Sequence, residues 1–205
     1  MTGAVDQFVS RETSEDLQHY AALLKKWNAA INLIAPSTVD QVWDRHIRDS
    51  LQIAANIPKN TTSWVDLGSG GGLPGLVVAI VAKHNHPDLR ITLVESDQRK
   101  CSFLRTVIRE LGLNATVTAR RIEDIPPLQP DVISARALAA LPLLLRFFHH
   151  HATSKTVGIF PKGEKWQAEL AEAQQDWRFS FETAASTTDE NAVIFFVKEV
   201  TPCKP

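Results

Sequence analysis

The sequence predicts an α/β fold in which a mostly parallel sheet of seven strands carries helices on both faces. From residue 61 onward, short apolar runs alternate with helical patterns, which is typical of a parallel sheet. The last two predicted strands are joined only by a short polar turn at 187–190, so they form an antiparallel hairpin at one end of the sheet. With 205 residues, of which 44% are hydrophobic, the chain can bury one substantial core.

Residues 1–60 are predicted to form a helical extension that packs on an α/β domain at 61–205. Ser14 is a candidate N-cap for a first helix, in which apolar residues recur at helical spacing as far as Ile31. After a break that contains a proline, Thr38 is a candidate cap for a second helix.

The α/β domain follows as alternating elements. Strands are predicted at 63–67, 90–95, 115–119, 130–135, 156–160, 178–184 and 192–199. Helices are predicted at 73–83, 98–111, 138–150 and 163–175. Because the carboxyl ends of parallel strands share one edge of the sheet, a ligand is expected at that edge.

A glycine-dense turn, WVDLGSGGGLPG at 64–75, is the most informative segment. Gly70, Gly72 and Gly75 have the spacing of nucleotide-cofactor loops, where the backbone approaches the ligand closely. Asp66 would repel the pyrophosphate of a dinucleotide, but it would attract the ammonium and sulfonium groups of S-adenosylmethionine. The segment therefore favours S-adenosylmethionine, with an Asp66 that only caps the loop as the alternative.

Three further residues are candidates for the rest of this cofactor. Glu95 ends the second predicted strand, where a carboxylate would meet both ribose hydroxyls. After the third strand, Ile122 is placed to stack on an adenine ring, and Glu123 to accept a hydrogen bond from its exocyclic amine. Asp124 replaces Glu123 if the register slips by one residue, and a helix N-cap remains the alternative role for these acids.

Arg136 follows the fourth strand, where methyltransferases place the residues that meet the atom to be methylated. The Asn/Asp-Pro-Pro-aromatic motif of exocyclic-amine enzymes is absent there, and neither Cys101 nor Cys203 lies near it in sequence, as a carbon-five pyrimidine enzyme would require. Lys162 brings a second cation at the end of the fifth strand. Cations without an evident base suit an acceptor with its own lone pair, such as guanine N7, whose neighbouring O6 is a common partner of Arg and Lys.

Simpler interpretations of these cations remain open. Arg136 would form a structural ion pair with Glu95 or Glu123, and Lys162 would be a solvated residue at a helix start. Arg120 and Arg121 are candidates for contacts with RNA phosphates, as is the segment 45–49.

Two other groups of side chains are not assigned a function. Lys100 and the arginines of the helix at 98–111 are expected on an exposed face, because acids accompany them. His149, His150 and His151 are expected at a frayed helix end rather than in a metal site, because consecutive residues do not share a helix face.

Composition excludes several classes of protein. The net charge of −1 provides no global basic field for nucleic acid, so a nucleic-acid substrate would need a local patch. The sequence shows no apolar run of membrane-spanning length and no secretory signal, and its two cysteines do not suggest a disulfide framework. We therefore expect a cytoplasmic protein without a membrane or metal partner.

Several motifs together resemble the family of bacterial small-subunit ribosomal RNA guanine-N7 methyltransferases, also called glucose-inhibited division protein B or methyltransferase G. The motifs are Lys26-Trp27-Asn28, Ile31-Asn32-Leu33, Arg45-His46-Ile47, Asp49-Ser50, the loop from Asp66 to Gly75, Ile133-Ser134, Arg136-Ala137 and Lys162-Gly163. They cover roughly residues 15 to 200, and a generic methyltransferase lacks those before residue 60.

This resemblance implies a class I, Rossmann-like methyltransferase that uses S-adenosylmethionine to methylate one guanine of 16S ribosomal RNA. The substrate would be the naked RNA or the small ribosomal subunit, and the enzyme a monomer or a weakly associating chain. The family's cofactor contacts map onto Gly68, Leu73, Ile122, Glu123 and Arg136, to which the loop and strand patterns add Gly70 and Glu95. Its basic cleft residues, which would carry catalysis, map onto Arg121, Arg136 and Lys162.

One departure from the family concerns the substrate side. Asn191 stands where the family often has an arginine, and Arg178 or Lys198 is a candidate replacement. A small-molecule methyltransferase of the same fold and a dinucleotide-dependent oxidoreductase are the competing functions, the latter disfavoured by Asp66.

Overall fold

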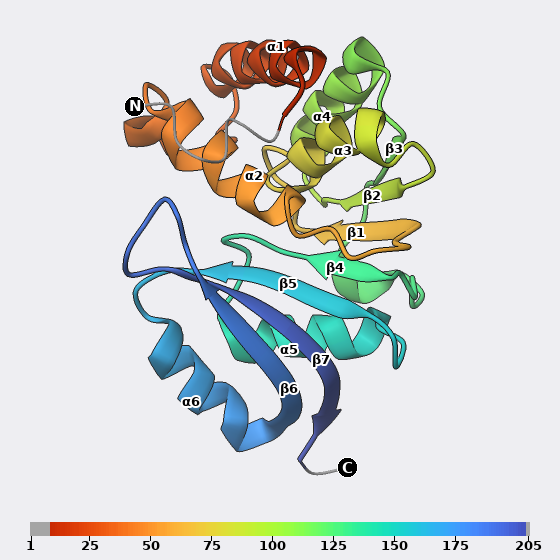
Figure 1. Ribbon diagram of the computed structural model, residues 1–205, viewed down its shortest axis with the longest axis vertical. Coiled ribbons are helices and arrows are strands. Elements are labelled where there is room, and N and C mark those ends of the chain that lie inside the picture. The colour runs from red at the N-terminus through yellow and green to blue at the C-terminus, as the bar shows by residue number, and fades with distance from the viewer. Residues whose placement is uncertain (1–8, 204–205) are drawn as a thin grey trace.

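The computed structural model describes residues 9–203 and contains one seven-stranded sheet. Its strands are β1 (Ser63–Leu67), β2 (Arg90–Val94), β3 (Ala115–Thr118), β4 (Val132–Ser134), β5 (Val157–Lys162), β6 (Trp177–Ala185) and β7 (Val193–Pro202). They lie in the order β3-β2-β1-β4-β5-β7-β6. The first five strands pair in parallel, and β7 is antiparallel to both β5 and β6. The predicted sheet with its antiparallel hairpin is confirmed (Figure 1).

Helices cover both faces of this sheet (Figure 1). They are α1 (Arg11–Asn28), α2 (Arg48–Ala54), α3 (Gly75–Asn85), α4 (Gln98–Leu111), α5 (Leu141–His151) and α6 (Trp166–Asp176), with short turns η2 (Pro36–Thr38), η3 (Trp43–Ile47) and η4 (Ile122–Asp124). The first four helices share one buried cluster with the sheet, and α5 and α6 share the other. Neighbouring strand residues alternate between the clusters, as Trp64 and Val65 do, because successive side chains of a strand point to opposite faces.

The N-terminal helices belong to the same core as the sheet. Leu17, Tyr20 and Leu24 of α1 are fully buried in the cluster that also holds Leu76 of α3 and Leu93 of β2. Core packing is therefore continuous across residue 60, and the division into 1–60 and 61–205 stays a prediction.

Several predicted helix starts are wrong. Ser10, not Ser14, caps α1, and its hydroxyl accepts a hydrogen bond from the Thr13 amide. Thr38 caps no helix: its hydroxyl donates to the Ala35 carbonyl, and the next helical residues begin at Trp43. The helix predicted from residue 138 begins at Leu141, which leaves 138–140 in a bent loop between β4 and α5.

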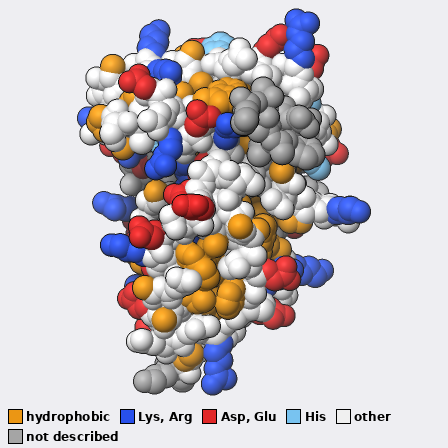
Figure 2. Space-filling model, turned by 60° about the vertical axis from the view of Figure 1, so that its left-hand side comes forward, with side chains coloured by type: hydrophobic (Ala, Val, Ile, Leu, Met, Phe, Trp, Pro, Cys, Tyr) orange, Lys and Arg blue, Asp and Glu red, His pale blue; other side chains and the backbone are white. Residues whose placement is uncertain are grey.

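The surface agrees with the small net charge. Figure 2 shows basic and acidic side chains interspersed over one face, without a continuous basic field. Between residues 9 and 203, no helix is long and apolar enough to cross a membrane.

Candidate active site

The glycine loop follows β1 and leads directly into α3. Gly70 and Gly72 have φ angles of 53° and 85°, in the left-handed region that favours glycine. Gly75 is required for a different reason: a Cβ atom there would lie 2.5 Å from Leu93 Cδ2 and 2.7 Å from Asp66 Oδ2. The loop can therefore fold tightly over the end of β1 only with glycine at these positions.

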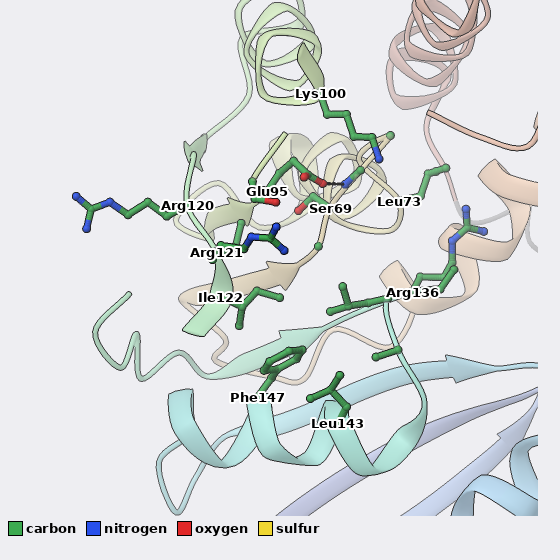
Figure 3. A pocket seen from close by; sticks show the side chains of 18 of the residues that line it. Ser69, Leu73, Glu95, Lys100, Arg120, Arg121, Ile122, Arg136, Leu143 and Phe147 are labelled. Atoms are coloured by element: carbon green, nitrogen blue, oxygen red, sulfur yellow. Dashed lines mark hydrogen bonds between the residues drawn. The ribbon is translucent and has the colours of Figure 1, made fainter. Parts of the chain in front are cut away.

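Glu95, immediately after β2, fixes this loop. Its Oε2 accepts a hydrogen bond from the Gly70 amide at 2.9 Å (Figure 3). Its Oε1 accepts one from the Asp97 amide at 2.8 Å. A carboxylate has about four acceptor positions, so each oxygen retains one for a ligand. Glu95 thus supports the loop and can still meet a polar group in the cavity that it lines.

Asp66 lies beneath the loop and is fully buried. The Ser134 hydroxyl donates to its Oδ1 at 2.6 Å, and Trp64 Nε1 donates in turn to the Ser134 hydroxyl at 2.8 Å. Its Oδ2 has no hydrogen-bond partner among the residues that the structure describes. Burial raises the pKa of Asp66 to about 6. Asp66 does not line the cavity, so it would favour a cationic ligand through its field rather than through contact.

A cavity of about 430 Å³ opens between the loop, the end of β2 and the start of α5 (Figure 3). Every residue predicted to bind the cofactor lines it: Gly68, Gly70, Leu73, Glu95, Ile122, Glu123 and Arg136. Arg120 and Arg121 line it as well; Arg121 points into it, whereas the Arg120 side chain points away (Figure 3). Asp124 is not among the lining residues, and no side chain caps η4, so neither alternative for these acids is supported within the described chain.

Several residues that line the cavity were not identified by the sequence motifs. Leu138, Leu143 and Phe147 add an apolar wall opposite the loop, next to Ile122. Lys100 also lines the cavity, so the prediction of a purely exposed face was wrong for this residue. Asp97 caps α4 by accepting from the Lys100 amide, and its own amide donates to Glu95. A capping residue two positions after Glu95 is the signal that could have indicated Lys100.

The N-terminal motifs shape the cavity from outside the sheet. The buried Tyr20 hydroxyl of α1 donates to the Gly71 carbonyl at 2.6 Å. Asn28 Oδ1 accepts hydrogen bonds from the amides of Leu33 and Ile34, at 2.9 and 3.0 Å, and Leu33 lines the cavity. Asn28 of the Lys-Trp-Asn segment therefore holds Leu33 at the cavity, and Tyr20 ties α1 to the glycine loop.

Arg136 is held by the second N-terminal motif. Its Nη1 donates to Asp49 Oδ2 at 2.9 Å, and its Nη2 lies 2.9 Å from His46 Nδ1. The ion-pair partner is therefore Asp49, and the predicted alternatives Glu95 and Glu123 were wrong. The Arg136 side chain is only 16% exposed, so its direction is set by these two partners.

His46 is a neutral acceptor in this arrangement. Burial, and then the neighbouring Arg136 charge, lower the pKa of His46 to about 4. At pH 7 its Nδ1 can accept from Arg136 while its Nε2–H donates to the Thr38 hydroxyl at 2.7 Å. The Thr38 hydroxyl then donates to the Ala35 carbonyl, which completes a consistent chain of hydrogen bonds.

A second cavity, of about 580 Å³, lies on the other side of Arg136. Arg136 and Ala137 line both cavities. Lys162 lines the second cavity, but its side chain is only 10% exposed and its Nζ contacts the Ala139 carbonyl and Glu169. The interpretation of Lys162 as a solvated helix start was wrong, because it ends β5 and is tied to α6.

The candidate replacements for the family arginine lie too far from this cavity. Arg178 pairs with Thr201 and is seven residues from the end of β6 that carries the loop, or about 23 Å at ~3.3 Å per residue. Lys198 pairs with Ser180 and also lies away from that end. The exposed cations that do line the second cavity are Arg45 and Lys165.

The three consecutive histidines are structural. They lie in the last turn of α5, and each places a ring nitrogen 2.9 to 3.2 Å from a backbone carbonyl of another segment: Val200, Ile125 and Ile122 respectively. The prediction of a frayed helix end was therefore wrong. Within residues 9–203, no cluster of three or more His, Cys, Asp or Glu side chains could hold a metal ion.

Comparisons with known proteins agree with this geometry. Residues 13–193 match the family model described as rRNA small subunit methyltransferase G. The chain is 53% identical over 190 residues to a ribosomal RNA small subunit methyltransferase G of Cereibacter sphaeroides, which covers 93% of this chain and 92% of that protein. It is 54% identical over 188 residues to the protein of the same name from Paracoccus denitrificans, with 91% and 94% covered.

The fold is also found in solved structures. A crystal structure of a mutant of MtNAS in complex with S-adenosylmethionine aligns with a TM-score of 0.59 and 20% identity. The alignment covers 91% of this chain and 77% of that one, and at this identity it shows the likeness of the fold alone.

Proposed function

The chain belongs to the rRNA small subunit methyltransferase G family, and from that membership we propose that it transfers the methyl group of S-adenosylmethionine to N7 of one guanine in 16S ribosomal RNA. Enzymes of this class need a cofactor site and an acceptor site that meet at the transferred methyl group. The two cavities that adjoin at Arg136 support this assignment.

The residues of the first cavity fit the chemistry of the cofactor. Glu95 retains acceptor positions for ribose hydroxyls, Ile122 and Phe147 offer apolar surface for a purine ring, and the glycine loop allows close approach. The buried carboxylate of Asp66, with one unpartnered oxygen, favours a positive charge above it. When bound, the cofactor supplies an electrophilic methyl group.

The observation that carries the proposal is the position of Arg136 between the two cavities. Its guanidinium has five N–H donors, of which the contacts with Asp49 and His46 use two. The remaining donors are available to a guanine O6 or a phosphate in the second cavity. Guanine N7 attacks with its own lone pair, so this chain need only orient the base, and positioning alone can contribute ~7–11 kcal/mol.

The other proposed roles follow from position. Lys162 is held by Glu169 on the wall of the second cavity and would act as a fixed positive charge beside the acceptor. Arg121 at the first cavity and Arg45 and Lys165 at the second are exposed enough to meet RNA phosphates. The proposed enzyme is a monomer that acts in the cytoplasm, where small subunits are assembled.

Methyl transfer from labelled S-adenosylmethionine to small ribosomal subunits that lack the modification tests the proposal. Label in 16S RNA that yields strand scission after borohydride reduction and aniline treatment is expected, because that chemistry is specific for N7-methylguanine. Label confined to protein or small metabolites would contradict it and favour a small-molecule methyltransferase. Label at another atom of the RNA would retain the substrate and overturn the N7 assignment.

A further inference from the structure

Asp49 of α2 joins three segments that are far apart in the chain. Its Oδ2 accepts from Arg136, at 2.9 Å. Its Oδ1 lies 2.9 Å from Gln52 Nε2 and accepts from the Thr188 hydroxyl at 3.0 Å. One carboxylate therefore contacts both Arg136, which lines the two cavities, and the loop between β6 and β7.

Gln52 docks that loop, residues 186–192, onto α2. Gln52 is only 6% exposed, and its Oε1 accepts from the amide and hydroxyl of Thr187 at 3.0 and 3.2 Å. Its Nε2 lies within hydrogen-bond distance of the Ser186 and Thr188 hydroxyls as well as of Asp49. In Figure 1 the loop extends from the sheet to α2, as these contacts require.

Arg136 and the loop lie on the wall of the second cavity, with Asp49 between them. Arg136, Asp49, Gln52, Ser186 and Thr188 all line it. No hydrogen bond joins Arg136 to Thr188 among the described residues, whereas Asp49 bonds to both of them.

We propose that Asp49 is a positioning residue that sets Arg136 and the loop 186–192 at a fixed spacing across the acceptor cavity. A guanine that enters this cavity then meets a guanidinium and a loop placed by the same carboxylate, so a change at one is transmitted to the other. The inference rests on the proposed function and deepens it, because it assigns the residue that holds the acceptor side together.

All the partners of Asp49 are hydrogen-bond donors, which makes Asp49→Asn informative. The amide keeps the size of the side chain but presents its NH₂ group to Arg136 or to the Gln52–Thr188 side, where donor would face donor. We expect kcat for small subunits to fall about 10- to 100-fold. Asp44→Asn is the matched control, because Asp44 also pairs with an arginine in the adjacent helical turn but lies outside both cavities.

A double-mutant cycle separates positioning from a general loss of stability. Arg136→Gln and Thr188→Val are combined in the parent and in the Asp49→Asn background, and kcat/KM is measured for each. We expect the two changes to be non-additive by about 3- to 30-fold in the parent and additive once Asp49 is replaced. Additivity in both backgrounds would overturn the proposal.

Amide hydrogen exchange of segment 186–192 gives an outcome that does not depend on methyl transfer. Arg136→Gln should accelerate exchange of this segment several-fold in the parent and leave it unchanged in the Asp49→Asn background. Equal exchange in parent and Arg136→Gln overturns the link through Asp49. If Arg136→Gln accelerates exchange only when Asp49 is present, but the protein does not methylate small subunits, the link through Asp49 stands and the proposed function is overturned.

Discussion

Replacing Asp66 with asparagine should stabilise the folded protein, and by an amount that depends on pH. Asp66 is fully buried, and burial raises its pKa from the ordinary 3.8 to about 6. A carboxyl group with a higher pKa in the folded state binds its proton more tightly there, so its ionisation destabilises that state. Each pKa unit corresponds to roughly 1.36 kcal/mol, so ionisation of Asp66 lowers the free energy of unfolding by about 3 kcal/mol above pH 6.

Asparagine keeps the size of the side chain and an acceptor for the Ser134 hydroxyl, and it carries no charge. Below pH 4 both proteins have a neutral side chain at position 66, so they should have similar free energies of unfolding. As the pH rises through 4 to 6, the wild type loses stability relative to Asp66→Asn, and the difference stays constant above that range.

Urea unfolding at half-unit pH intervals from 4 to 8 measures this difference, with Asp40→Asn at an exposed position as control. Parallel pH profiles for Asp66→Asn and wild type would refute the reasoning. Calorimetry adds a functional readout: the variant should bind S-adenosylmethionine more weakly, and S-adenosylhomocysteine with a smaller loss, because only the former has a sulfonium charge. Equal losses for both ligands would argue against a role for the Asp66 charge.

Four other substitutions test separate parts of the site. Gly75→Ala forces a Cβ into buried neighbours and should lower the free energy of unfolding by about 1–3 kcal/mol. An unchanged urea midpoint would contradict this geometry. Tyr20→Phe leaves the Gly71 carbonyl unpaired and should cost about 1–3 kcal/mol and weaken S-adenosylhomocysteine binding, whereas a stability loss with unchanged affinity would separate α1 from the loop. Arg45→Ala and Lys165→Ala should each lower the salt dependence of RNA binding by about one phosphate contact, and an unaltered slope would remove them from the interface.

The sheet was predictable because its signals are local. Alternation of apolar strands and helices identified all seven strands, and glycine spacing located the tight turn between β1 and α3. Helix starts were less certain, because Ser10 and Ser14 carry the same capping chemistry and only tertiary packing decides between them.

The contacts of the site residues were not predictable from spacing. Arg136 and Asp49 are 87 positions apart, and nothing in the pattern distinguishes Asp49 from Glu95 as the partner. Lys100 looked like an ordinary exposed lysine because its cavity is formed by a loop from another part of the chain. Motif resemblance marked Asp49 as informative, but the reason for it required the folded arrangement.

The position of β7 has a consequence for how the protein becomes active as it is synthesised. β7 lies between β5 and β6, and β6 pairs with β7 alone among the described strands. Until β7 has left the ribosome, β6 has no partner and the loop 186–192 has only one of its two flanking strands in place. Such late, long-range pairing is slow and exposes strand edges during folding. The second cavity should therefore form only after β7 has emerged and paired, because Val193 and Ile194 of β7 line it.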